Sequence, residues 1–367
     1  MVFLFCLSAF VAAYVAILLI RSARGHARRY GQSKPQRFHV GDVPRLGGLA
    51  IFAGTACGWG AAAVAFNIQN RGFFDITATV ALAWAVVALP ALIGGAVEDV
   101  TQRLAVVFRL LLTGVSAALA VGLFDLSLPR VGIPVVDAAL AGMPLVGVAL
   151  AVMAVAGLPH AFNIIDGYNG LAGMVALVAC LALTYVALQV GDRQLAGILL
   201  CLAGATAGFL FWNFPRGMIF AGDGGAYLWG VCIAVASLVL VKRHPQVSPW
   251  FPMLLLIYPI WETFFSIYRK LTRGMSPSVA DALHFHQLIY RRVVHRVFHD
   301  DETRRILMRN NRTAPYLWAF TMLTVAPAMM FWRTTWVLML FCALFALAYV
   351  GAYLMIVRFK VPRWLRR

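Results

Sequence analysis

Residues 143–190 read MPLVGVALAVMAVAGLPHAFNIIDGYNGLAGMVALVACLALTYVALQV, which is two long apolar stretches joined by a short polar segment. Each stretch, 143–162 and 170–190, has the roughly 20 apolar residues that an α-helix needs to cross a bilayer. The joining segment contains Asn163, Asp166 and Asn169. Polar groups of this kind are costly inside hydrocarbon. The stretch therefore predicts a helical hairpin in a membrane, with its polar turn at one membrane face.

The same pattern continues in both directions along the chain. Of the 367 residues, 62% are hydrophobic and 12% are charged, and the mean hydropathy is +0.82, which excludes an ordinary soluble domain. Further apolar stretches lie at 2–20, 46–67, 76–97, 106–125, 195–213, 224–241, 250–268, 314–331 and 335–357. We predict an all-α, polytopic integral membrane protein of about eleven transmembrane helices. It forms one domain over residues 1–367, and residues 269–313 form a basic, histidine-containing cytoplasmic loop within it.

The orientation follows from the basic residues, which are retained mainly on the cytoplasmic side of membrane proteins. Most of the 31 lysines and arginines fall on that side if the N-terminus is outside and the C-terminus is cytoplasmic. Four polar clusters then lie at the cytoplasmic face. They are Glu98-Asp99, the segment from Asn163 to Asn169, Gly222-Asp223-Gly224, and the segment from Asp281 to His286. A shared face predicts one active site.

Three other interpretations of the composition are weaker. Residues 1–20 lack the basic residues that precede the apolar run of a secretory signal peptide, so we interpret them as a retained first helix. The net charge of +17 is spread over loops between spans, where topology and anionic lipid explain it better than nucleic acid. All six cysteines lie in apolar stretches without CxxC spacing, which predicts neither a disulfide framework nor a zinc site.

Two glycine patterns, Gly54-x-x-x-Gly58 and Gly204-x-x-x-Gly208, predict close helix packing.

The acidic pair Glu98-Asp99 ends an apolar stretch, where two carboxylates are costly unless a cation or metal accompanies them. A solvated turn is the alternative, because acidic residues are common at helix ends. Arg103 and Arg109 follow closely, and guanidinium groups bind phosphate. Cations beside anions at a membrane face predict a site for phosphate and metal.

The next two clusters offer oxygen ligands and flexible backbone. Asn163, Asp166 and Asn169 supply carbonyl and carboxylate oxygens for Mg²⁺ and amides for a nucleobase edge, although a simple turn is the alternative. Asp223 lies between glycines that free backbone N–H groups to meet phosphate while the carboxylate reaches a cation. A lone Gly-Asp-Gly is a weak signal, and its weight comes from facing the same side as the other clusters.

The last cluster, His284-Phe285-His286, precedes the doublet Arg291-Arg292. Neither a carboxylate nor a third histidine stands at a zinc-like spacing such as HExxH, so phosphate binding is favoured over metal ligation. A solvated basic loop is the alternative.

Taken together, these motifs give a chain that resembles the polyprenyl-phosphate N-acetylhexosamine-1-phosphate transferases. That family includes the phospho-MurNAc-pentapeptide translocases and the enzymes that initiate O-antigen and teichoic-acid linkage synthesis. The resemblance runs through most of the chain. It rests on Pro44-Arg45-Leu46-Gly47-Gly48, the acidic pair with Arg109, the segment from Asn163 to Leu171, Phe214-Pro215 leading to Gly222-Asp223, and His284-Phe285-His286.

The resemblance implies an enzyme of the bacterial inner membrane that transfers a sugar 1-phosphate, GlcNAc-1-phosphate or a relative, from a UDP-N-acetylhexosamine to undecaprenyl phosphate. UMP leaves, and the lipid-linked product begins a cell-surface glycan such as lipopolysaccharide O-antigen or a cell-wall polymer. It also implies a Mg²⁺ cofactor, with Mn²⁺ as an alternative, and a homodimer.

The family's functional residues carry over position by position. Asp223 and Asn163 would hold the metal. Glu98, Asp99 and Asp166 would be catalytic, the first two by orienting or deprotonating the lipid phosphate. The remaining matches would contact substrate: Arg45, Arg109, Gly167, Asn169, His284, His286 and Arg292.

The sequence also departs from the family pattern. Glu98 stands where many members have aspartate, which shifts its carboxylate by about 1.5 Å. Asn169 replaces an aspartate, so a role near uridine survives better than a metal role. The His-Phe-His motif favours a simple N-acetylhexosamine donor over the phospho-MurNAc-pentapeptide translocase branch. A secondary transporter is the alternative from another class, but the halves show no repeat and Glu262 is the one clear carboxylate deep in a predicted span.

Overall fold

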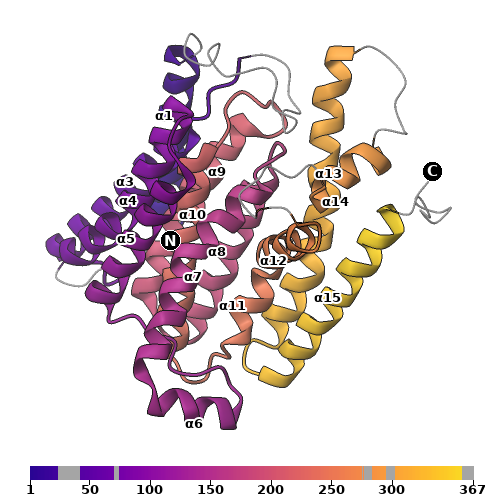
Figure 1. Cartoon of the computed structure of the whole chain (residues 1–367). Coiled ribbons are helices and arrows are strands. Elements are labelled where there is room, and N and C mark those ends of the chain that lie inside the picture. The colour runs from indigo at the N-terminus through magenta and orange to yellow at the C-terminus, as the bar shows by residue number, and fades with distance from the viewer. Residues whose placement is uncertain (24–41, 70–73, 275, 277–282, 295–301, 358–367) are drawn as a thin grey trace.

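The computed structural model describes residues 1–23, 42–69, 74–274, 276, 283–294 and 302–357. This part of the chain is helical and contains no strand. Figure 1 shows most of the helices side by side in one bundle, which confirms the all-α prediction. The elements are α1 (Val2–Ser22), α3 (Gly47–Gln69), α4 (Ala78–Thr101), α5 (Val106–Phe124), α6 (Pro134–Gly142), α7 (Pro144–Ile165), α8 (Leu171–Gln189), α9 (Arg193–Asn213), α10 (Gly222–Arg243), α11 (Trp250–Leu255), α12 (Ile257–Leu271), α13 (Phe285–Leu288), the π-helix η1 (Ile289–Val294), α14 (Glu302–Met330) and α15 (Thr335–Val357).

Helix α10 is the centre of the bundle. Every residue from 224 to 241 is buried, because α3, α4, α7, α8 and α9 all pack around this helix. A helix that is apolar on all sides needs such a surrounding. The helices at the edge, such as α1 and α15, bury a narrow stripe and leave large apolar side chains exposed, as a helix facing lipid does.

Within the described residues, nine helices are long and apolar enough to cross a membrane: α1, α3, α4, α5, α7, α8, α9, α10 and α15. The protein is therefore a polytopic membrane protein, as predicted. The predicted count of eleven is not confirmed. The segment 314–331 forms the second part of α14, which is not among the nine, and the segment 250–268 is not one helix.

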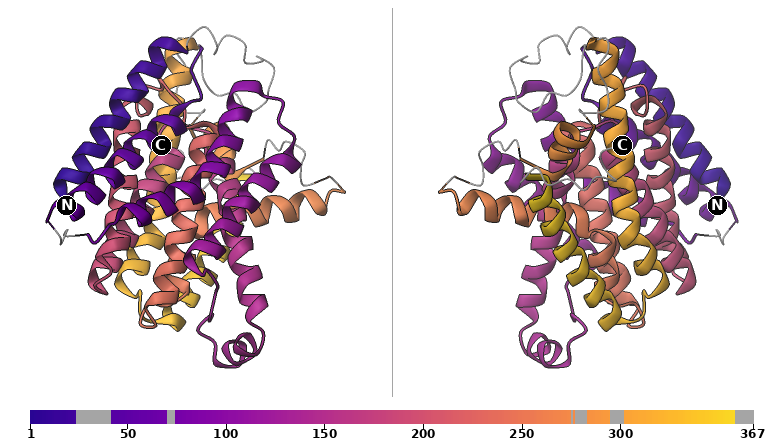
Figure 2. Two further views of the ribbon diagram at one scale, coloured as in Figure 1. Left: turned by 90° about the vertical axis from the view of Figure 1, so that its left-hand side faces the viewer. Right: turned by 90° about the vertical axis from the view of Figure 1, so that its right-hand side faces the viewer.

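The break in segment 250–268 corrects the prediction of a single span there. Helix α11 ends at Leu255 and α12 begins at Ile257. Pro259 explains the break, because proline has no N–H to donate and its ring clashes with the carbonyl four residues earlier. Figure 2 shows the result, in which α12 projects sideways from the bundle across the direction of its neighbours.

Small residues let α1 approach α3 and α9 closely. A Cβ added to Gly204 or Gly208 would overlap the backbone carbonyls of Phe5 or Ala9, and one added to Gly54 would overlap that of Ser8. Close backbone approach of this kind is typical of small-xxx-small patterns in membrane helices. The predicted packing role of both patterns is confirmed.

Candidate active site

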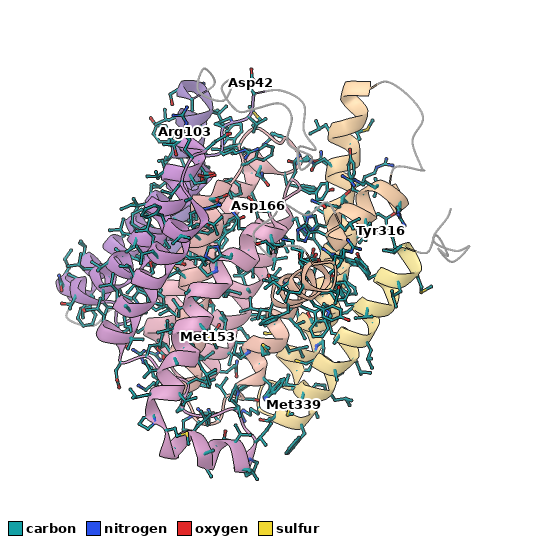
Figure 3. The ribbon with its side chains drawn as sticks, viewed as in Figure 1. Asp42, Arg103, Met153, Asp166, Tyr316 and Met339 are labelled. Carbon is teal, nitrogen blue, oxygen red and sulfur yellow. The ribbon has the colours of Figure 1, made fainter. Side chains whose placement is uncertain are left out.

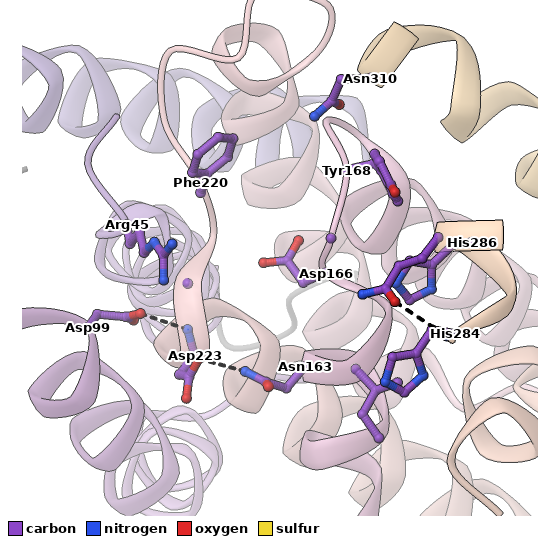
Figure 4. A pocket seen from close by; sticks show the side chains of 14 residues that line it. Arg45, Asp99, Asn163, Asp166, Tyr168, Phe220, Asp223, His284, His286 and Asn310 are labelled. Carbon is purple, nitrogen blue, oxygen red and sulfur yellow. Dashed lines mark hydrogen bonds between the residues drawn. The ribbon is translucent and has the colours of Figure 1, made fainter. Parts of the chain in front are cut away.

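A cavity of about 240 Å³ lies near the end of the bundle opposite α6. Figure 3 shows Asp166 toward this end and Met339 toward the other. Figure 4 shows the cavity from close by, with carboxylate and histidine side chains on opposite sides of it. The cavity is lined by eight of the twelve predicted site residues: Arg45, Asp99, Asn163, Asp166, Gly167, Asp223, His284 and His286. The four polar clusters of the sequence thus meet at one place, although Asp281 lies outside the described residues.

Asp223 lies in the first turn of α10, and the side chain of Asp99 in α4 fixes the position of that turn. The Asp99 carboxylate accepts hydrogen bonds from the backbone N–H groups of Asp223 and Gly224, each at 2.9 Å. The first N–H groups of a helix have no partner within the helix, and a negative charge there is favourable. Asp99 is 5% exposed, so both of its oxygens serve to fix Asp223.

Glycines permit this junction of α3, α4 and α10. A Cβ on Gly95 would overlap the backbone N of Gly224, and one on Gly48 would overlap that of Gly225. The sequence suggested that the glycines around Asp223 free N–H groups for phosphate. In the structure the Gly224 N–H donates to Asp99 instead. The glycines at this junction allow the backbones of α3, α4 and α10 to meet.

The Asp223 carboxylate has three side-chain donors, of which the Tyr227 hydroxyl is the most distant, at 3.4 Å from Oδ2. The Arg109 guanidinium donates from Nη1 to Oδ2 at 2.9 Å, and the Asn163 amide donates from Nδ2 to Oδ1 at 2.7 Å. Arg109 and Asp223 form a partly buried ion pair, with each side chain 21% exposed. Arg109 thus contacts Asp223 in this structure, and its contact with substrate stays a prediction.

Asp166 follows the last residue of α7 and lines the same cavity as Asp223. Burial raises the pKa of the Asp166 carboxyl to about 7, and the Asp223 carboxylate acts in the same direction. Arg45 and the Gly222 N–H oppose this shift. Two carboxylates that repel each other in a half-buried place favour a cation between them. We call Asn163, Asp166 and Asp223 the carboxylate wall.

The opposite side of the cavity is formed by His284 and His286, which we call the histidine wall. Their rings are parallel, with centroids 5.4 Å apart. The ring Nδ1 of His284 contacts Oε1 of Glu262 at 2.9 Å. Burial lowers the pKa of His286 to about 3, although Glu262 opposes the shift. His286 is therefore neutral at physiological pH.

Among the described residues, four of the predicted site residues do not line the cavity: Glu98, Arg109, Asn169 and Arg292. Glu98 accepts a hydrogen bond from the backbone N–H of Leu104 at 2.8 Å and so closes the turn between α4 and α5. Arg292 donates to the backbone carbonyls of Ile356 and Val357 at the end of α15, at 2.6 and 2.7 Å.

Asn169 belongs to a network of asparagines beside the cavity. It is 1% exposed, its N–H donates to Asn310 Oδ1 at 2.8 Å, and its Nδ2 donates to Asn311 Oδ1 at 2.9 Å. Asn213 supports the same loop by accepting from the Gly170 N–H at 2.6 Å. The network joins the α7–α8 loop to α14, so Asn169 connects these segments and does not face the cavity.

Sequence reasoning missed several residues of the site. Phe220, Tyr168, Gln287 and Asn310 line the cavity, and Glu262 lies behind His284. The signals were present for two of them: Asn310 is part of an asparagine doublet in a basic segment, and Glu262 is a lone carboxylate in an apolar stretch. Phe220 and Tyr168 carried no local signal, because aromatic residues are common throughout this chain.

The sequence profile of glycosyl transferase family 4 matches residues 45–241, which is more than half of the chain. The chain belongs to glycosyl transferase family 4. The matched residues contain the whole carboxylate wall, together with Arg45 and Asp99. The histidine wall, Glu262 and Asn310 come from the part of the chain that follows the family match.

Named relatives agree with this membership. A probable undecaprenyl-phosphate N-acetylglucosaminyl 1-phosphate transferase from Bacillus subtilis is 29% identical over 283 residues, covering 76% of this chain and 75% of that protein. The decaprenyl-phosphate N-acetylglucosaminephosphotransferase of Mycobacterium tuberculosis is 27% identical over 322 residues, covering 78% of this chain and 77% of that protein. The undecaprenyl-phosphate α-N-acetylglucosaminyl 1-phosphate transferase of Thermotoga maritima is 30% identical over 134 residues, covering 36% and 40%.

Proposed function

We propose that this protein transfers GlcNAc-1-phosphate from UDP-GlcNAc to undecaprenyl phosphate and releases UMP. One observation carries the proposal: carboxylates, an asparagine amide, an arginine and two histidines line a single cavity at one end of a membrane-embedded bundle. Such a set suits phosphoryl transfer, in which positioning and charge neutralisation supply most of the catalysis. The relatives' names, all of them polyprenyl-phosphate GlcNAc-1-phosphate transferases, support the same reaction.

In this proposal the attacking phosphate of the lipid needs placement more than deprotonation. A phosphate monoester has a second pKa of about 6 and is largely dianionic at neutral pH. Both oxygens of Asp99 already accept backbone hydrogen bonds, so Asp99 would act by holding Asp223. Arg45, which lines the cavity, supplies positive charge for the phosphates. Phe220 offers an aromatic face on which a nucleobase can stack.

The carboxylate wall fits Mg²⁺. Asp223, Asn163 and the nearby Asp166 provide carboxylate and amide oxygens, which are the ligands of a hard cation. Within the described residues there is no group of three or more metal-ligating His, Cys, Asp or Glu side chains. Mg²⁺ commonly takes one or two carboxylates and completes its shell with substrate phosphates. When bound, the cation would neutralise charge on the two phosphates of the donor.

The cavity end of the bundle would face the cytoplasm of a bacterial cell, with the protein in the inner membrane. The distribution of lysine and arginine supports this orientation. The donor sugar nucleotide would then enter from the cytoplasm, while the polyprenyl chain stays in the bilayer beside the apolar outer helices.

The test is UMP release by the detergent-purified full chain. The protein is given Mg²⁺, undecaprenyl phosphate and, in separate reactions, the UDP derivatives of GlcNAc, GalNAc, FucNAc and QuiNAc. We expect lipid-dependent release with UDP-GlcNAc that EDTA stops. Absence of release with every donor, from protein shown to be folded, would contradict the proposal. Release with one of the other donors alone would contradict the choice of sugar.

A further inference from the structure

Glu262 of α12 is a buried carboxylate on which three hydrogen-bond donors converge. It is 0% exposed. It accepts from the Tyr349 hydroxyl of α15 at 2.7 Å and from the backbone N–H of Phe285 at 3.2 Å, and it contacts Nδ1 of His284 at 2.9 Å. A buried charge without partners is very costly. These contacts explain how the carboxylate is tolerated, and they tie α12 to the histidine wall.

The contact with Glu262 determines which atoms His284 presents to the cavity. A carboxylate accepts hydrogen bonds and does not donate them, so the Nδ1 of His284 carries the hydrogen. The other ring nitrogen, Nε2, lies on the far side of the imidazole from Nδ1. Since His284 lines the cavity, that nitrogen is the one available to a ligand. Figure 4 shows the ring beside the cavity, on the side that faces the carboxylate wall.

His286 provides an internal comparison. Its ring is parallel to that of His284, and it also lines the cavity. No described residue gives its Nδ1 a hydrogen-bond partner, and the side chain is 1% exposed. Of the two stacked histidines, His284 is therefore the one with a carboxylate behind it. A carboxylate on one nitrogen of an imidazole favours a proton on the other nitrogen when an anion approaches it.

We infer that Glu262 is a positioning residue, which holds the His284 ring by its Nδ1–H so that the hydrogen on Nε2 is donated to a phosphate oxygen of the bound sugar nucleotide. The inference rests on the proposed function, because it takes a nucleoside diphosphate as the ligand. With the ligand in place, the ring of His284 lies between two anions and donates one hydrogen bond to each, to Glu262 from Nδ1 and to the phosphate from Nε2. Glu262 itself touches no substrate.

The test is a double-mutant cycle on the full chain. Glu262→Gln keeps an oxygen that accepts from His284 and an amide that donates to Tyr349, so it removes the charge and keeps the shape. We expect KM for UDP-GlcNAc to rise roughly tenfold, as for loss of a charge-assisted hydrogen bond, with kcat changed much less. In the background of His284→Ala, the same Glu262→Gln change should leave KM unaltered, because it acts through His284.

Tyr349→Phe is the matched control. It removes a donor from the other oxygen of the same carboxylate and leaves the contact with His284 in place. It should lower the midpoint of thermal unfolding and leave KM unchanged. If Glu262→Gln also lowers the midpoint without changing KM, the role of Glu262 is structural and the inference is overturned. Equal effects of Glu262→Gln with and without His284 would overturn it as well.

Binding of UDP separates this inference from the proposed reaction. UDP carries the two phosphates and needs no turnover, so its affinity can be measured by calorimetry on each variant. Glu262→Gln should weaken UDP binding roughly tenfold, and Tyr349→Phe should not. If the unaltered protein binds UDP but releases no UMP with any donor, the proposed reaction fails while the positioning role is still decided by the binding data. Unchanged UDP affinity in Glu262→Gln would contradict the inference.

Discussion

The carboxylate wall and the histidine wall face each other across one cavity, but they are held in different ways. The backbone of the central helices takes part in holding the carboxylate wall: the Asp99 carboxylate accepts from the first N–H groups of α10, and glycines allow α3, α4 and α10 to meet. Side-chain contacts fix the histidine wall, through Glu262 and Tyr349. The first wall lies within the family match and the second lies beyond it. We propose that the first wall performs the chemistry and the second sets the affinity for the donor.

Asp223→Asn should have the largest effect. It removes the negative charge that Arg109 and Asn163 surround, and we expect UMP release to fall by roughly 10²–10³-fold or more. Asp125→Asn is the matched control, because Asp125 follows the last residue of α5 and its side chain is 99% exposed. It should keep activity. Comparable losses in both variants would indicate a general defect rather than a catalytic site.

Asp99→Asn should have the next largest effect. The asparagine oxygen accepts one backbone N–H of α10, but its NH₂ group faces the other N–H, so one donor is left without an acceptor. The cost is about 1–3 kcal/mol, and misplacement of Asp223 should lower kcat. UMP release and thermal unfolding are measured on the same preparation. Unchanged values in both measurements would contradict the role given to Asp99.

Gly95→Ala tests the packing of the carboxylate wall by adding one methyl group. The added Cβ would overlap the backbone of Asp223 and Gly224, and overpacking of this kind typically costs about 1–3 kcal/mol. We expect a lower unfolding midpoint together with reduced activity. Gly114→Ala is the control, since a Cβ at Gly114 has nothing within 4 Å. If the unfolding midpoint falls by the same amount in the control, the close contact of Gly95 with α10 does not explain the effect.

His286→Gln tests the histidine wall through pH and should have the smallest effect. The pKa of His286 is about 3 in the folded protein and 6.5 in the unfolded chain. Between these values the unfolded chain binds a proton that the folded protein does not. The unaltered protein therefore loses stability as pH falls below 6.5, by up to about 1.4 kcal/mol per pH unit. The decline in unfolding midpoint from pH 7.5 to pH 5.5 should be smaller in His286→Gln. Equal declines would contradict the burial of a neutral His286.

Local sequence patterns predicted most of the long helices and eight of the fourteen residues that line the cavity, because long apolar runs and clustered polar residues are local signals. They did not predict which member of the acidic pair reaches the cavity. Adjacent residues on a helix point about 100° apart, so Asp99 turns to α10 while Glu98 turns to Leu104. The contacts of Asn169 with α14 and of Arg292 with α15 join segments far apart in sequence, and no local pattern encodes them. Pro259 separates α11 from α12 within the span predicted at 250–268.

The central claim is that the chain moves a sugar together with its phosphate, and the fate of the β-phosphorus tests this most directly. UDP-GlcNAc labelled with ³²P at the β-phosphate is incubated with undecaprenyl phosphate, Mg²⁺ and the purified protein. We predict that the label enters the lipid-soluble product while unlabelled UMP appears in the aqueous phase. Label remaining in water as UDP, with GlcNAc on the lipid, would show that the sugar–phosphate bond is broken and would contradict the account.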